Sequence, residues 1–341
     1  MPSAESPQHR PLWKGRALAL VGIVLVAVNL RTAVATMSPI YEQIGQDIVI
    51  TAVVIGLLGM VPPIMFSLAG ILSPRLSRAT GLEWALVIAC LAMVVGPVLR
   101  GFANDATMLG VGTIIALAGA GVGNILIPPA VKKYFPDRIG RMTAVYATIM
   151  SIGATLSPLA AAPATIAIGW RGWLLAWAFI GLACAAPWVA LALAHRRDLR
   201  SGDAMGNTHT ALPAPIARSR LAWMLALAHL VPTVSVYAMF AWLPTIMHDI
   251  AGANEIEAGA MLSLFALMGL PSALIAPLLG ARGWTTQIMI GGTVAFVAGF
   301  AGLLIAPAAA PWLWVGLIGL GPFVFPLLLA LFGLRTRSHH A

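Results

Sequence analysis

Long apolar stretches separated by short polar breaks occupy almost the whole chain. A membrane-spanning α-helix needs about 20 mostly apolar residues, because the hydrocarbon layer is about 30 Å thick and the helix rises about 1.5 Å per residue. Strands of an outer-membrane barrel would give shorter segments of alternating hydrophobicity. The pattern therefore predicts an all-α integral membrane protein with ten transmembrane helices. The ten stretches are 17–40, 51–72, 83–101, 106–131, 141–164, 171–194, 221–247, 257–280, 286–306 and 311–333.

The longest polar break is residues 195–220, a basic segment that contains glycine and proline. It predicts a cytoplasmic linker between a six-helix half, residues 17–194, and a second half of four helices, residues 221–334. The short polar ends, residues 1–16 and 335–341, are predicted to be a cytoplasmic N-terminal segment and a cytoplasmic tail.

The composition agrees with a membrane protein, since 60% of the residues are hydrophobic and only 9% are charged. Soluble domains carry about 25% charged residues. A chain this poor in charge cannot cover a water-facing surface, which excludes a soluble enzyme, a nucleic-acid-binding domain and a disordered chain. The expected surroundings are therefore the lipid bilayer.

The formal net charge of +9 is a topology signal, because the basic residues gather on one side of the predicted helices. Cytoplasmic loops of membrane proteins carry an excess of Lys and Arg. With the N-terminus in the cytoplasm, only Arg100 and Arg171 lie on the outer side, and Arg31 lies within a helix. We therefore expect a multi-pass protein of the bacterial inner membrane with both termini inside, and no nucleic-acid partner. The inner side holds Arg10, Lys14, Arg16, Arg75, Arg78, Lys132, Lys133, Arg138, Arg141, Arg196, Arg197, Arg200, Arg218, Arg220, Arg282, Arg335 and Arg337.

Arg31 is the most informative polar residue, because it lies near the middle of the first apolar stretch. An arginine at a helix centre costs about 2.5–3.5 kcal/mol on insertion scales. The 11 carboxylates of the chain all fall outside the predicted spans, so no acidic partner is expected near mid-membrane. The guanidinium either binds backbone carbonyls at helix breaks, or snorkels, or lines a water-filled cavity and binds a small-molecule substrate. The planar donor fork of arginine suits a small planar anion.

Five other polar side chains within the apolar stretches are candidates for the same substrate site. They are Asn29, Asn124, Tyr146, His229 and Tyr237. Core packing or anchoring at the membrane interface is the alternative for the tyrosines. His229 is either a proton carrier or a histidine hydrogen-bonded between helices.

Motifs typical of enzymes are missing from the sequence: it has no HExxH, no GxSxG and no phosphate-binding glycine loop. Cys90 and Cys184 lie inside apolar stretches, which favours small buried hydrophobic residues over a disulfide or a metal site. The sequence predicts a protein that is not an enzyme and that uses no cofactor or metal.

Three stretches resemble the major facilitator superfamily and, within it, the cyanate/nitroimidazole transporter family. They are "NLRTAVATMSPIYEQI" from Asn29, "GVGNILIPPAVKKYFPDRIGRMTAVY" from Gly121, and the segment from Tyr237 to Leu279. The resemblance implies a secondary transporter with two six-helix halves and a central site that opens alternately to each side. Helices 1, 4, 7 and 10 would line the path, and three of these carry Arg31, Asn124 and Tyr237.

Two departures from the family pattern matter for function. Pro232 and Thr233 stand where the family has a more polar pair, and the chain ends after its tenth predicted helix. Helices 11 and 12 of the family are thus expected to be absent. The leading hypothesis is a transporter of a small anion or a polar heteroaromatic compound, cyanate-like or nitroimidazole-like. The alternative is a truncated membrane remnant that does not transport.

Overall fold

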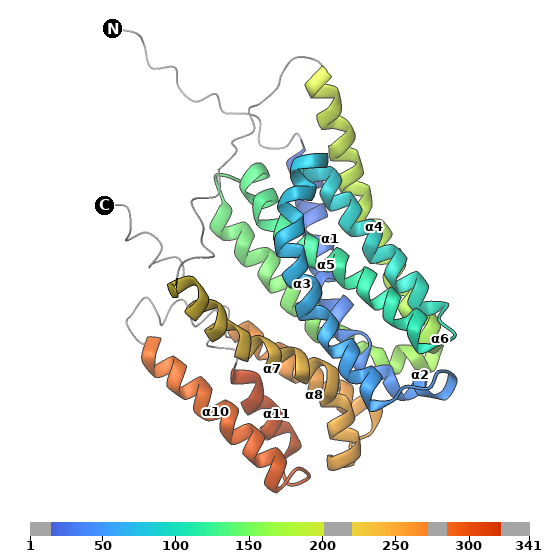
Figure 1. Ribbon diagram of the computed structural model, residues 1–341, viewed down its shortest axis with the longest axis vertical. Helices are drawn as coiled ribbons and strands as arrows, with labels where there is room; N and C mark the ends of the chain where they lie inside the picture. The colour runs from blue at the N-terminus through green and yellow to red at the C-terminus, as the bar shows by residue number, and fades with distance from the viewer. Residues whose placement is uncertain (1–14, 201–219, 272–284, 322–341) are drawn as a thin grey trace.

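The computed structural model describes residues 15–200, 220–271 and 285–321, and the described chain is built from helices (Figure 1). Six of its helices are long and apolar enough to cross a membrane. The prediction of an all-α membrane bundle is confirmed. The helices are α1 (Arg16–Ala35), α2 (Tyr41–Asp47), α3 (Ala52–Thr80), α4 (Leu82–Gly101), α5 (Ala106–Tyr134), α6 (Ile139–Arg200), α7 (Arg220–Ala251), α8 (Glu255–Leu267), α10 (Thr285–Ile305) and α11 (Pro311–Leu320).

The first half, α1 to α6, is packed through small residues that let helix backbones approach closely. A Cβ atom at Gly119 of α5 would lie 2.5 Å from the carbonyl oxygen of Ala89 in α4. Gly22 of α1 makes room in the same way for the indole of Trp188 in α6, which is fully buried. Close packing of this kind replaces the hydrophobic driving force that helices lack inside lipid.

Helix α6 covers two predicted spans, 141–164 and 171–194, within one element. The two parts meet at Gly169, whose φ of 71° lies in the left-handed region that favours glycine. The element continues to Arg200, so the predicted linker begins as helix. The remainder of that linker, residues 201–219, lies outside the described residues.

The second half contains α7, α8, α10 and α11, which lie beside the first half in Figure 1. Helix α8 begins at a capping box, in which Asn254 and Glu257 satisfy each other's backbone N–H groups. The predicted spans 257–280 and 311–333 extend into residues 272–284 and 322–341, which lie outside the described part of the chain.

Helix α1 ends at Ala35, before the predicted limit of residue 40. The short 3₁₀ turn η1 (Ser38–Ile40) follows and carries Pro39 in its first turn, where a missing backbone N–H does no harm. The chain then enters α2, which is fastened to α6. Asp47 accepts a hydrogen bond from Trp170 Nε1 at 2.9 Å and from Arg171 at 2.6 Å. These bonds lower the pKa of Asp47.

Candidate functional site

Arg31 and Tyr237 meet between the two halves of the molecule. The guanidinium of Arg31 on α1 is half-buried and donates a hydrogen bond to the hydroxyl oxygen of Tyr237 on α7. Tyr237 is buried. Within the described residues, no carboxylate forms an ion pair with Arg31. The two candidates predicted to share a site are therefore brought together, and the partner of the arginine is a neutral hydroxyl.

Phe66 on α3 packs against Tyr237 and is the third residue at the Arg31–Tyr237 pair. Its ring centroid lies 5.9 Å from that of Tyr237, and the two rings stand edge to face at 79°. Aromatic pairs favour this arrangement. Sequence reasoning missed Phe66, because an apolar ring in an apolar helix carries no distinguishing signal.

Asn124 of α5 faces the boundary between α1 and α3. A Cβ atom at Gly123 would lie 2.9 Å from Leu30 of α1, and one at Gly121 would lie 3.0 Å from Phe66 of α3. Successive residues of a helix are separated by about 100° around its axis. Asn124 therefore falls between the two packed faces, and its side chain is exposed. Its role in a substrate site stays a prediction.

Three of the remaining candidates are not brought to Arg31 by any described contact. Asn29 is buried on the other side of α1, with its Nδ2 atom 3.9 Å from Cys184 Sγ. Tyr146 packs against the core of the first half. His229 lies in α7, but its side chain is outside the described residues. Cys90 and Cys184 are free and buried, as predicted.

The end of the molecule that carries α2 is closed by polar contacts between the halves. Gln43 donates a hydrogen bond to the Glu255 carboxylate at the start of α8, and His248 Nε2 lies 3.8 Å from Glu42 Oε2. A cavity of about 510 Å³ lies here and is lined from both halves. Partial burial, together with the nearby charge of Glu42, raises the pKa of Glu255.

Toward the other end the two halves diverge. Helices α3 and α7 touch in the first third of α3, where a Cβ atom at Gly59 would lie 2.7 Å from Ala241 Cβ. Beyond this contact the helices separate in Figure 1, and Ile71 and Trp223 are 61% and 60% exposed. The Arg31–Tyr237 pair thus lies between the α2 end, where polar contacts join the halves, and the end at which α3 and α7 separate.

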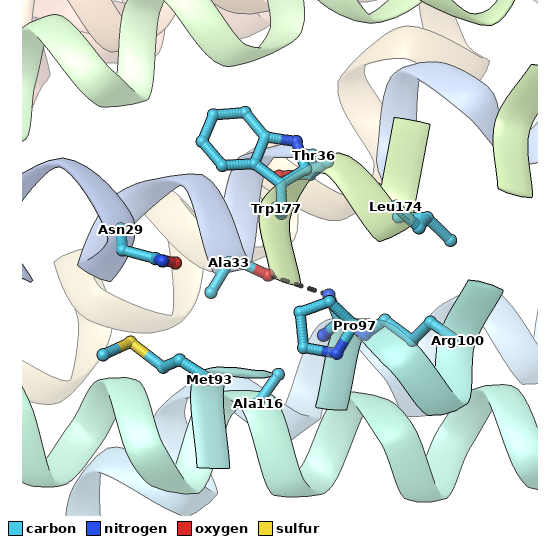
Figure 2. A pocket seen from close by; sticks show the side chains of 9 residues that line it. All are labelled: Asn29, Ala33, Thr36, Met93, Pro97, Arg100, Ala116, Leu174 and Trp177. Atoms are coloured by element: carbon cyan, nitrogen blue, oxygen red, sulfur yellow. Dashed lines mark hydrogen bonds between the residues drawn. The ribbon is translucent and has the colours of Figure 1, made fainter. Parts of the chain in front are cut away.

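A second arginine is buried inside the first half. Arg100, which the sequence analysis assigned to the outer side, lies in the last turn of α4 with only 2% of its surface exposed. Its Nε donates to Thr113 Oγ1 at 3.1 Å, and its Nη1 lies 3.5 Å from the carbonyl oxygen of Ala33. Figure 2 shows this side chain at a small cavity, with Asn29, Ala33 and Thr36 around it.

Comparison with known families decides the class of the protein. The family model of the Major Facilitator Superfamily matches residues 19–341. The chain belongs to this superfamily. The family is one of multi-pass membrane transporters, in agreement with the resemblance noted in the sequence.

Three bacterial transport proteins are similar to this chain in sequence. It is 30% identical to the 2-nitroimidazole transporter of Escherichia coli (strain K12), over 96% of this chain and 82% of that protein. It is 26% identical to the uncharacterized transporter YycB of Bacillus subtilis (strain 168), over 99% and 82%. It is 22% identical to the cyanate transport protein CynX of Escherichia coli (strain K12), over 92% and 80%.

Solved structures show the same fold. A bacterial homologue of the lysosomal transporter Spinster matches with a TM-score of 0.70 at 14% identity, over 94% of this chain and 75% of that one. The nucleoside transporter NupG matches with a TM-score of 0.69 at 12% identity, over 96% and 84%. At such identities the likeness concerns the fold alone.

Proposed function

We propose that this protein is a secondary transporter that moves a small anion or a polar heteroaromatic compound across the bacterial inner membrane by alternating access. The observation that carries the proposal is the pairing of Arg31 with Tyr237 between the halves. Because the Tyr237 hydroxyl is neutral, it does not cancel the positive charge of the Arg31 guanidinium. That charge stays available for an anionic or electron-rich ligand. Cyanate-like and nitroimidazole-like compounds are the substrate classes, in keeping with the names of two relatives.

Two aromatic rings beside Arg31 favour heteroaromatic ligands as well as small anions. Phe66 and Tyr237 present ring surfaces next to the guanidinium. A planar heteroaromatic compound gains from packing on such rings while a nitro or ring acceptor binds the arginine. Asn124 adds an amide that both donates and accepts hydrogen bonds.

The transport route joins the two ends described above. With both termini in the cytoplasm, the closed α2 end faces outward and the diverging end faces inward. The distribution of Lys and Arg supports this orientation. A membrane-impermeant thiol reagent tests it on a cysteine placed at exposed Val49, which is 81% exposed at the α2 end. Labelling of intact cells is expected, and protection of this position would reverse the orientation.

Transport by vesicles that contain the purified chain tests the function. We expect uptake of labelled cyanate and of 2-nitroimidazole by the wild-type protein and none by Arg31→Ala. Arg31→Lys keeps the charge but loses the planar fork, so its KM for cyanate should rise about tenfold or more, since a charge-assisted hydrogen bond contributes about 1.5–3 kcal/mol.

Arg75→Lys is the matched control. Arg75 is exposed on α3 and donates to the carbonyl oxygen of Ile71 in its own helix. Its substitution should leave both fluxes unchanged. Wild-type transport by Arg31→Ala would refute the role of Arg31, and wild-type vesicles that move neither compound would refute the substrate class.

A further inference from the structure

The cavity beside Arg100 collects hydrogen-bond donors that have no acceptor. Arg100 Nη2 and Trp177 Nε1 are both buried, and neither has a hydrogen-bond partner in the described part of the chain. Both residues line the same cavity. A guanidinium and an indole N–H can only donate. Two unsatisfied donors from α4 and α6 at one cavity call for an acceptor within it.

The charge of Arg100 is also uncompensated. No carboxylate of the described residues lies within ion-pair distance of it. Tyr41 interacts electrostatically with Arg100, yet burial raises the pKa of Tyr41 to about 12, against the opposing effect of Arg100. The phenol therefore stays neutral at physiological pH. A buried charge of this kind is costly unless an opposite charge is bound.

The size of the cavity limits the occupant. Its volume is about 10 Å³, which is room for about one water-sized particle. Heteroaromatic compounds and phosphate are too large. The lining is otherwise apolar or neutral, with Met93, Pro97 and Leu174 beside the polar groups shown in Figure 2.

We propose that this cavity binds one small monovalent anion of halide size, held by Arg100 and Trp177. The site lies inside the first half and is separate from the Arg31–Tyr237 pair, so it does not depend on the proposed transport function. Because Arg100 also contacts the carbonyl oxygen of Ala33 in the last turn of α1, a bound anion would hold the guanidinium in place against the helix that carries Arg31.

Thermal unfolding of the purified full-length chain in halide and non-halide salts tests the site. We expect sodium bromide and sodium chloride to raise the Tm by about 3–5 °C over sodium gluconate at equal ionic strength, with saturation. Trp177→Phe keeps the ring but removes the donor, so it should weaken the halide effect. Arg100→Gln should abolish it.

Two controls separate this site from the substrate site and from a folding defect. Arg31→Gln should keep the halide effect in full. Crystals of the wild-type protein grown in bromide should give an anomalous peak between Arg100 and Trp177. The proposal is overturned if bromide and gluconate act alike on the wild-type Tm, if Trp177→Phe and Arg100→Gln both keep the full shift, or if the cavity holds water without an anomalous signal.

Discussion

At the scale of single residues, the hydroxyl of Tyr237 stands where a ligand acceptor would stand. A guanidinium has five N–H donors, and an anion that binds the donor used by this hydroxyl competes with it. A hydrogen bond from a charged group such as this guanidinium has a net free energy of about 1.5–3 kcal/mol, and the hydroxyl occupies only part of its donors.

Tyr237→Phe should therefore tighten the binding of cyanate, because the competitor is removed while the ring contact with Phe66 remains. We expect the Kd to fall about threefold to tenfold. Titration calorimetry on the purified chain measures it. Tyr146→Phe, on a tyrosine that packs against the core of the first half, should change nothing. Weaker binding by Tyr237→Phe would show that the hydroxyl contacts the ligand instead.

Residue patterns revealed only part of this site. Arg31 and Tyr237 stood out because polar side chains are rare in apolar stretches. Their pairing could not be predicted, since it depends on how far α7 is rotated toward α1. The burial of Arg100 could not be predicted from its position near a helix end, because it results from α1, α4 and α5 packing around it.

At the scale of helices, the contact between α3 and α7 depends on a missing side chain. A Cβ atom at Gly59 would lie 2.7 Å from Ala241 Cβ, closer than two carbons can pack. Nothing lies within 4 Å of the same position at Gly70, on the same helix. Gly70 therefore serves as the control for Gly59, because both lie in α3 and only Gly59 is in close contact with α7.

Gly59→Ala should push the halves apart and lower the stability of the protein by about 1–3 kcal/mol, the usual cost of overpacking. Gly70→Ala should be neutral or stabilising by up to about 1 kcal/mol, because alanine favours the helix. Thermal unfolding, followed by cyanate uptake, measures both effects. A Gly59→Ala protein as stable and active as Gly70→Ala would contradict the close contact.

Helix existence was predicted more accurately than helix ends. The apolar stretches located α3, α4 and α5 because length and hydropathy alone decide whether a segment can cross lipid. The early end of α1 was missed, because it depends on the turn at Pro39 and on the short helix α2 that follows. Apolar residues of that turn continue the hydropathy of α1 and hide the break.

At the scale of the whole molecule, we predict that proton binding by Glu255 favours the contact between the halves at the α2 end. The pKa of Glu255 is raised in the closed arrangement by burial and by Glu42, while Gln43 and His248 act in the opposite direction. The closed form thus holds the proton more tightly than an arrangement with the halves apart. Protonation of Glu255 thus lowers the free energy of the closed form relative to the form with the halves apart. This stabilisation is fully present below the ordinary glutamate pKa of about 4.3, and it is lost as pH rises through the raised pKa of Glu255.

Distances between spin labels on α2 and α8 should therefore show a larger closed fraction at acidic pH than at neutral pH. Glu255→Gln is neutral at every pH and should stay closed throughout. Glu257→Gln, which keeps the capping box that begins α8, should behave as the wild type. A pH response in Glu255→Gln equal to that of the wild type would exclude Glu255 as the titrating group.

The cavity of about 510 Å³ at the α2 end has a pharmacological consequence. Its volume falls in the range of drug-binding sites, about 300–1,000 Å³, and its walls come from both halves, with Tyr41 and Ile55 on one side and Pro244 and Thr245 on the other. A compound wedged there would bind the two halves to each other at a distance from Arg31. Inhibition of this kind would lower the maximal rate and could not be relieved by excess substrate.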